Sequence, residues 1–495
     1  MTSSQMILKH ALGAGLVLAS LGSAGASDGH VAMDARAQPV PYDAAAYKFG
    51  PDPVYNLPYD FQRQLDIYGA KHANPTARPL LELGREMYGP GQFEPGINLF
   101  GEKNLVFPQL LLYGDLRTVV GYNNTGGKDK EIVASKLTLD LDLKITATER
   151  IHATFTPLDH RGDVTRVSQV DGQSDNKAIF DLEPDALFIE GDMARIISGA
   201  TNKDNGYDIP FTAGLIPLLF QNGVWMQDAI TGFAFTIPAR NSPALQISNM
   251  DVTFFAGFDR VTTAAMANND NSGVFGFNTF IEAMSGYWEV GYGYVDGHDS
   301  KDDLSYHNAS AAFTRRYWDR ISNSVRVIAN FGQEPGAGQT QTADGYLFLI
   351  ENSLISSKPL TLVPYFNAWA GFDRPQSLAR AAGAGGVLLN TGINFETDGI
   401  TGFPTMDDTG HNTYGGALGI EYLFDLTQQV VFEFAALDAF DQPGTAADKA
   451  PEYGLGARYQ RNLSNAWIFR TDLINVFRDN NPDVTGVRFE VRRKF

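Results

Sequence analysis

The titratable residues of this 495-residue chain are scattered, and no group of them matches a common catalytic pattern. Cysteine is absent, which excludes thiol catalysis, thiolate metal sites and a disulfide scaffold. No P-loop, G-x-S-x-G, H-E-x-x-H or EF-hand sequence occurs. His298, beside Asp296 and Asp299, could serve a hydrolase at a rim, but a solvated loop histidine explains it more simply. The sequence therefore predicts no catalytic residue, no metal ligand and no cofactor.

Charged residues that alternate with apolar ones offer a different chemistry. Successive side chains of a strand point to opposite faces, so charges at every second position form one wall. Such a wall could guide charged solutes through a pore, or its members could simply pair across strands. Both signs occur, so a preference for anions or cations stays open. The predicted pore-lining residues are Arg117, Lys136, Asp140, Asp142, Lys144, Arg326, Arg470, Arg488, Glu490 and Arg492.

The elements that would position these charges are strands with a strict period of two. In residues 136–147, leucine or isoleucine fills every second position from Leu137 to Ile145, and the other positions are polar or charged. A helix would mix the two sets around its circumference. Similar segments recur from about residue 107 to Phe495, which predicts an all-β protein. A soluble sandwich also alternates, so other features must decide between the two architectures.

The links between these segments favour a membrane barrel. Beyond about residue 240, short and long links alternate, as expected of short periplasmic turns and long external loops. Aromatic residues also gather near segment ends, where an interfacial girdle would place them. The short links lie near 148–150, 285–286, 318–320, 356–358, 425–428 and 462–465. The long links lie near 159–184, 259–273, 333–342, 372–409 and 441–450.

The C-terminus carries a family resemblance. The chain ends in an alternating strand with Val487, Phe489 and Val491 on one face and Phe495 as its last residue. This resembles the C-terminal signature of Gram-negative outer-membrane β-barrels, which implies outer-membrane localisation and recognition of Phe495 by the barrel-assembly machinery. Arg493 departs from the usual apolar residue and would have to snorkel to the headgroups. The segment 210–228 is also loosely similar to strand-turn-strand segments of alginate-export-type barrels.

The N-terminal region differs from the rest of the chain. Residues 1–26 have the pattern of a signal peptide, with an apolar run from Ala11 to Leu21 and small residues before a cut after Ala26. Residues 27–105 are rich in proline, which predicts a periplasmic extension or partial plug with little sheet. Two short helices are expected there, one with Phe61, Leu65 and Tyr68 on a face and one with Leu80, Leu83 and Met87.

Residues 106–495 are thus predicted to form a transmembrane antiparallel β-barrel of about 18 strands, with about 16 as the fallback, wide enough for an aqueous channel. Residues 372–409 are the best candidate to fold inward, and Ile216–Val224 could be an external hairpin tip or an inward lobe. The acidic residues of 297–303 and 405–408 are expected in external loops. Replacing Arg488 and Arg492 by glutamate is expected to shift selectivity toward cations.

The predicted function is a porin-like channel for small hydrophilic or ionic solutes. The alternatives are a barrel sheath around a partner, in an electron conduit or polysaccharide-export complex, and, ranked last, an outer-membrane hydrolase. Expected partners are outer-membrane lipid, lipopolysaccharide and small solutes, with a homotrimer as one candidate assembly. The net charge of −19 makes nucleic-acid binding an unfavourable hypothesis.

Overall fold

The computed structural model describes residues 79–84, 96–266, 272–336, 340–355, 361–381, 383–425, 427–440, 451–479 and 481–495. The predicted signal peptide and most of the predicted extension lie outside these ranges, as does the helix expected around Leu65. The assignments of 1–26 and 27–105 therefore stay predictions. Within the described residues, no helix has the length and apolar character needed to cross a membrane.

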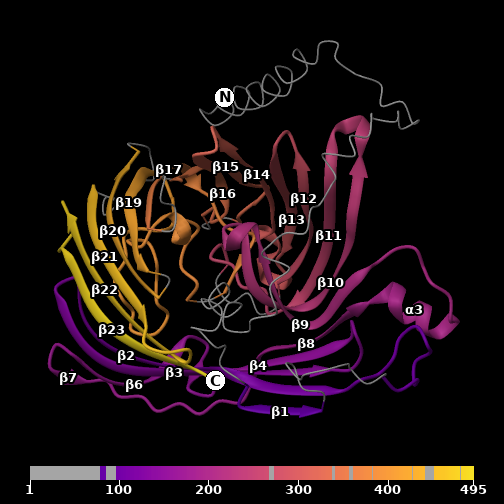
Figure 1. Cartoon of the computed structure of the whole chain (residues 1–495). Coiled ribbons are helices and arrows are strands. Elements are labelled where there is room, and N and C mark those ends of the chain that lie inside the picture. Colours follow the sequence, from indigo (N-terminus) through magenta and orange to yellow (C-terminus); the bar gives the residue numbers. More distant parts are fainter. Residues whose placement is uncertain are drawn as a thin grey trace, which may run out of the picture. The chain divides into compact units, whose positions relative to one another are not determined.

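The strands form one antiparallel sheet that closes on itself as an 18-strand barrel (Figure 1). This confirms the all-β fold and the larger of the two strand counts. The ring closes where the last strand pairs with the first, with Asp115 opposite Lys494 and Asn124 opposite Thr485. The wall strands are β2 (Gln109–Thr125), β3 (Lys128–Lys144), β4 (Arg150–Phe155) continued by β6 (Asp163–Val170), β8 (Pro184–Asp192), β9 (Pro210–Phe220), β10 (Met226–Ser242), β11 (Ile247–Asp259), β12 (Gly273–Ala283), β13 (Gly286–Asp296), β14 (Tyr306–Tyr317), β15 (Ile321–Phe331), β16 (Asp344–Leu354), β17 (Leu362–Arg374), β19 (Thr413–Asp425), β20 (Gln428–Ala439), β21 (Glu452–Asn462), β22 (Trp467–Arg478) and β23 (Val484–Lys494).

The third wall strand is interrupted. β4 pairs with the lower part of β3, the chain then makes an excursion, and β6 pairs with the upper part, with Val170 opposite Lys130. Part of the predicted long link 159–184 is therefore wall. The smaller elements are β1 (Leu81–Gly84), β5 (Asp159–His160), β7 (Gln173–Ser174), β18 (Ala379–Arg380), the helix α3 (Met193–Thr201) and the 3₁₀ turns η1 (Gln221–Gly223), η2 (Pro243–Leu245), η3 (Asp299–Leu304) and η4 (Leu389–Thr391).

The helix predicted around Leu83 is wrong in its described part, because β1 is a strand paired with β2, with Leu81 opposite Leu112. The last strand ends opposite Asp115, so the first residues of β2 are left with an open edge on that side. Backbone N–H and C=O groups without a hydrogen-bond partner are costly at a membrane surface. β1 supplies partners for these groups of β2. Local periodicity carries no information about such a distant partner.

The outer face of the wall is apolar. Phe254, Phe348, Leu418, Phe432 and Leu473 lie at alternate positions of their strands and are exposed. A closed barrel pairs every strand with two neighbours, so no sheet edge is left open within the membrane. An exposed apolar belt on a closed barrel is the surface that meets lipid. Arg493, the predicted departure from this belt, stacks on the Trp467 ring, with its guanidinium carbon 5.6 Å from the ring centroid.

The links define two different rims. One rim carries the short links 145–149, 243–246, 284–285, 318–320, 426–427 and 463–466, and both ends of the barrel wall lie at this rim. The exception on it is the link 193–209, which contains α3. The other rim carries the long links 260–272, 297–305, 332–343 and 375–412. It also carries three short ones, the turn 126–127, the hairpin tip 221–225 and the last hairpin, which turns within 479–483. By the general pattern of outer-membrane barrels, the short rim faces the periplasm.

A charge placed on the outer face tests this arrangement. Phe434 lies near the middle of β20 and faces outward. The substitution Phe434→Arg is expected to lower the free energy of unfolding in lipid vesicles by about 2–4 kcal/mol, because the guanidinium would enter hydrocarbon. The control Leu463→Arg, in a short turn, is expected to cost about 0–1 kcal/mol. Urea unfolding in vesicles measures both, and equal costs would contradict the lipid-facing assignment.

Candidate functional site

The predicted pore-lining charges at the barrel seam are paired with each other. Arg117 donates two hydrogen bonds to Glu490, at 2.9 and 2.8 Å. Arg492 forms an ion pair with Asp115 on the neighbouring strand. Cross-strand pairing therefore accounts for these side chains, which was the simpler of the two hypotheses for the seam.

Other members of the predicted set have separate partners. Lys136 pairs with Asp159 at 2.7 Å, so its partner comes from the excursion between β4 and β6. Asp140 accepts a hydrogen bond from Thr154 at 2.8 Å. The remaining contacts place Asp142 3.5 Å from Arg150, Lys144 over the Phe107 ring at 5.3 Å, and Arg326 2.6 Å from Gln221 Oε1 and 3.9 Å from Glu289.

A buried charge network joins the wall to residues 375–412, here called the inner loop. Arg488 pairs with Asp472 at 2.8 Å and with Asp398 of the inner loop at 2.6 Å, and its side chain is only 2% exposed. Arg470 bonds both Asp472 and the inner-loop residue Glu396, at 2.8 and 3.0 Å. Arg458 completes the network by bonding the same two carboxylates, at 2.6 and 2.7 Å. The wall cations thus hold the inner loop in place.

The pKa of the Asp398 carboxyl group is set by its burial and by the groups that contact it. Burial alone would raise the pKa of its carboxyl group. The Arg488 guanidinium and the hydrogen bonds from Thr401 and Ile400 outweigh burial and hold that pKa below its ordinary value. Since the folded pKa is lowered, the contact stabilises the protein at neutral pH. Its contribution is lost only as the pH falls through the folded pKa.

The inner loop also contacts the wall by hydrogen bonds that are not ion pairs. Glu433 on β20 accepts bonds from the backbone N–H groups of Ile393 and Asn394, each at 2.9 Å. On β2 and β3, Asn123 and Lys130 donate to the Thr401 carbonyl at 3.1 and 3.0 Å. These partners all stand at inward positions of their strands. The contacts confirm that the long link near 372–409 folds inward (Figure 1).

At its start, the inner loop contacts the opposite side of the wall. The backbone N–H of Gln376 donates to Asn330 on β15 at 2.8 Å, and Asn308 on β14 donates to the Gln376 carbonyl at 2.9 Å. Asp407 and Asp408, expected in an external loop, instead belong to this inward segment. Asp408 accepts a bond from the Gly386 N–H at 2.5 Å within the inner loop, and the Asp407 N–H donates to Glu452 on β21 at 3.1 Å, which ties this part of the loop to the wall.

The tip of the β9–β10 hairpin, residues 221–225, is a second inward segment. Trp225 is fully buried and donates its indole N–H to Asn308 at 2.8 Å. Gln221 accepts from Ser310 on β14 at 2.7 Å. The start of β10 pairs in parallel with β18 of the inner loop, with Met226 opposite Ala379. Of the two hypotheses for Ile216–Val224, these contacts favour the inward lobe.

Inward-facing glycines make room for both segments, and sequence reasoning missed them. A Cβ atom built on Gly291 would lie 2.6 Å from the Trp225 ring, and one on Gly293 would lie 2.6 Å from Leu378. A Cβ atom on Gly486 would lie 2.7 Å from Pro404. The signal that could have revealed them is glycine at the inward parity of a strand, where a charged or polar residue was expected.

The upper interior is apolar, which corrects the expectation that inward residues meet water. Val274, Tyr306, Ile328 and Val476 face inward and are fully buried. Together with residues of the inner loop and the hairpin tip they form two hydrophobic clusters. The reason is that two chain segments occupy this space, so the wall packs against protein instead of solvent.

A polar crevice of 680 Å³ remains between the inner loop and the β3–β10 side of the wall. Its lining comes from the upper half of β3, the excursion between β4 and β6, the strands β6, β8 and β10, the start of the link 260–272, and the inner loop around Gly399. Its charged lining residues are Lys130, Lys136, Arg161, Arg166 and Arg260 together with Asp159, Asp163 and Asp185. The lining thus counts five cations against three carboxylates, and two of these cations, Arg260 and Arg166, also pair with Glu183 and Asp175 just outside it.

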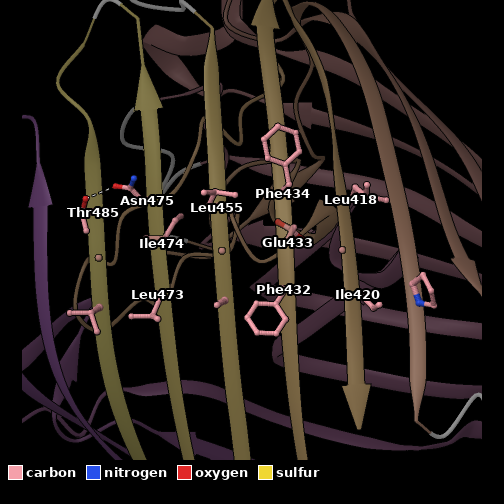
Figure 2. A pocket seen from close by; sticks show the side chains of 16 residues that line it. Leu418, Ile420, Phe432, Glu433, Phe434, Leu455, Leu473, Ile474, Asn475 and Thr485 are labelled. Atoms are coloured by element: carbon pink, nitrogen blue, oxygen red, sulfur yellow. Dashed lines mark hydrogen bonds between the residues drawn. The ribbon is translucent and has the colours of Figure 1, made fainter.

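A larger apolar groove of 840 Å³ lies on the outer face, over β17 and β19–β23 (Figure 2). Its side chains include Leu418, Phe432, Phe434 and Leu455, all exposed on the lipid-facing surface. A groove of this composition at this position fits acyl chains, and it has no access to solutes inside the barrel.

The described residues include one cluster with metal-ligand chemistry, His160, Asp181 and Glu183. His160 lies 2.5 Å from Asp181, and Glu183 is bonded by Arg260. Both glutamate and histidine are exposed, so the cluster is explained by pairing at the surface. His298 lies 3.6 Å from Asp296 and is likewise exposed. We therefore propose neither group as a catalytic or metal centre.

No family model and no curated protein matches the chain. Solved structures with a similar arrangement include OccK5 (OpdH) of Pseudomonas aeruginosa, with a TM-score of 0.48 and 9% identity over 78% of this chain and 98% of that one. OccAB4 of Acinetobacter baumannii has a TM-score of 0.49 and 11% identity over 78% and 97%. Wzi of Escherichia coli, an outer-membrane protein of group 1 capsule assembly described as a carbohydrate-binding β-barrel, has a TM-score of 0.43 and 11% identity over 77% of this chain and 84% of that one.

These likenesses are distant, so the assignment rests on the chain's own strand pairings and surface. The wall is closed, the outer face is apolar, and both ends of the wall lie at the short-link rim. Those three properties together are the ones expected of an outer-membrane barrel. The chain is a closed 18-strand antiparallel β-barrel of the outer membrane.

The charge network makes a prediction about the inner loop. Asp398→Asn removes one of the two carboxylates paired with buried Arg488. Breaking a buried ion pair by removing one partner costs about 3–5 kcal/mol of unfolding free energy. We expect the cost here to be about 3 kcal/mol or less, because Asp472 still pairs with Arg488. The inner loop should then become sensitive to added protease, while the unboiled protein keeps its barrel mobility on a gel. Asp302→Asn, in the link 297–305, is the control, and equal protease resistance of both variants would contradict the anchoring role.

Proposed function

We propose that the chain is an outer-membrane channel through which small hydrophilic solutes, with a preference for anions, move along the crevice. The observation that carries the proposal is the charged lining of that crevice. In the rest of the described upper interior, the inner loop and the hairpin tip pack against the wall through apolar clusters and ion pairs. A solute that crosses the barrel would therefore meet Lys130, Arg161 and their neighbours.

The preference for anions follows from how the charges are paired. Lys136 is offset by Asp159, and Asp163 is shared by Arg166 and Lys177. By contrast, Lys130 donates only to a backbone carbonyl, and Arg161 has no carboxylate within 4.0 Å among the described residues. Charges left unneutralised at a narrow, low-dielectric passage attract ions of the opposite sign.

The contents of the barrel disfavour the alternative of a sheath around a partner. The inner loop and the hairpin tip occupy the interior and bond to wall strands on opposite sides, from Asn330 on β15 to Arg488 on β23. A protein domain threaded through the barrel would have to displace both segments and break the buried network. A small solute needs only the crevice.

Planar-bilayer recording tests the channel itself. We expect the purified protein to give discrete, small conductance steps, because the crevice is the narrowest part of the path. A variant lacking most of the inner loop should give larger steps. If the wild-type protein is silent while this deletion variant conducts, the wall is a channel wall but the native protein is closed, and the proposed function fails. Silence from both variants, each with native gel mobility, would also contradict it.

Charge substitution in the crevice tests the ion preference. The double variant Arg161→Glu with Lys130→Gln removes both unpaired positive charges, and glutamine keeps a donor for the Thr401 carbonyl. We expect the reversal potential in a salt gradient to move toward that of a cation-selective pore. The control is Arg320→Glu, in the short turn 318–320. Equal reversal potentials for wild type and double variant would place the conduction path elsewhere.

The pair Arg488 and Arg492 does not serve this purpose. Arg488 is buried between Asp398 and Asp472, and Arg492 is bonded to Asp115. Replacing Arg488 by glutamate would set three carboxylates against each other and release the inner loop. Any change in selectivity would then report loss of structure instead of a lost solute contact.

A further inference from the structure

The helix α3 is an unusual element at the short-link rim. The other described links there are tight turns, whereas the link 193–209 between β8 and β9 holds a nine-residue helix. Its length is about 13 Å, from the rise of an α-helix. Figure 1 shows it at the end of β8, outside the ring of strands. No role in the crevice or the charge network accounts for it.

The exposed face of α3 is apolar. Met193, Ile196, Ile197 and Ala200 are exposed, and their spacing of three and four residues places them on one stripe. A helix on the surface of a soluble rim would turn such a stripe toward the protein. Here the stripe points away from it, and the exposed fractions of Met193, Ile196 and Ile197 are 43%, 38% and 38%.

The opposite face of α3 is fixed to the barrel. Asp192 accepts bonds from the N–H groups of Ala194 and Arg195, at 2.8 and 3.1 Å, and so caps the helix. Asn205 donates to the Ala194 carbonyl at 3.0 Å and to Ser198 at 3.1 Å. Gly199 packs so tightly that an added Cβ would lie 2.5 Å from the Phe100 carbonyl oxygen. The helix therefore cannot rotate its apolar stripe inward.

The stripe continues the lipid-facing surface of the wall. Leu187 and Ile189 are the exposed outward residues of β8, and Met193 follows at the same parity, while Asp192 between them is buried. The same rim carries exposed apolar residues at other turn tips, namely Leu245, Met284, Trp318 and Leu463. Apolar and aromatic residues at this level mark the boundary between hydrocarbon and headgroups.

We propose that α3 lies in the headgroup region of the periplasmic leaflet, with its apolar stripe inserted among the acyl chains. The molecule that covers the stripe is phospholipid, because the stripe is continuous with the lipid-facing side of β8. Arg195, exposed in the first turn on the side away from the stripe, and Lys203, exposed just after the end of the helix, would meet phosphate groups. The helix fixes the depth of the barrel on the β8–β9 side, where the wall has its longest periplasmic link.

The absence of cysteine permits a direct test by site-specific labelling. Ile196→Cys would be coupled to an environment-sensitive fluorophore and reconstituted in vesicles of phosphatidylethanolamine and phosphatidylglycerol. We expect blue-shifted emission and quenching by nitroxide lipids about twofold stronger than at a solvent position. The solvent control is Gly206→Cys, in the same link, where an added side chain meets open space. Leu473→Cys, on the lipid-facing wall, is the positive control.

Two outcomes would overturn the proposal. The label at position 196 could behave like that at position 206, which would mean that the stripe faces water in the purified protein. It could instead be blue-shifted yet insensitive to nitroxide lipids, which would mean that protein covers it. The labels at positions 206 and 473 show in the same preparation that the barrel is inserted, so failure to fold cannot imitate either result.

Discussion

The backbone hydrogen bonds between β23 and β2 are the constraint on which the rest of the structure depends. Hydrocarbon offers no partner for an open sheet edge, so the first and last strands of the wall must find each other across almost the whole chain. Once the sheet is closed at 18 strands, two consequences follow. Outward side chains must be apolar, and the enclosed space is too wide for wall side chains alone to fill.

The inner loop and the hairpin tip fill the space that the wall side chains leave. They therefore determine which residue types stand at the inward positions of the wall. Where the inner loop presents a carboxylate, as at Asp398, the wall supplies a buried arginine, because an unpaired buried charge would be costly. Where it presents an apolar or bulky side chain, as at Leu378, the wall supplies glycine. Inward positions thus carry charge, glycine or hydrocarbon according to the segment packed against them.

This explains which features could be predicted from sequence. The strand pattern, the ring closure and the inward fold of the long link near 372–409 follow from period-two alternation and link length, both of which are local signals. The inner-loop partner of Arg488 could not be predicted, because Asp398 is 90 residues away and belongs to a segment without periodicity. The strand β1 was missed for the same reason, since its pairing with Leu112 depends on where the last strand ends.

The same packing leaves the two sides of the interior unequal. On the β14–β23 side the inner loop is joined to the wall by the charge network and by apolar clusters. On the β3–β10 side, Lys130 and Asn123 hold the loop by backbone carbonyls, and flexible glycines such as Gly399 and Gly402 border the gap. Carbonyl contacts do not neutralise a cation, so Lys130 keeps its positive charge where it borders the crevice. The anchoring of the inner loop and the proposed anion preference therefore have the same origin, an asymmetry in how the inner loop is held.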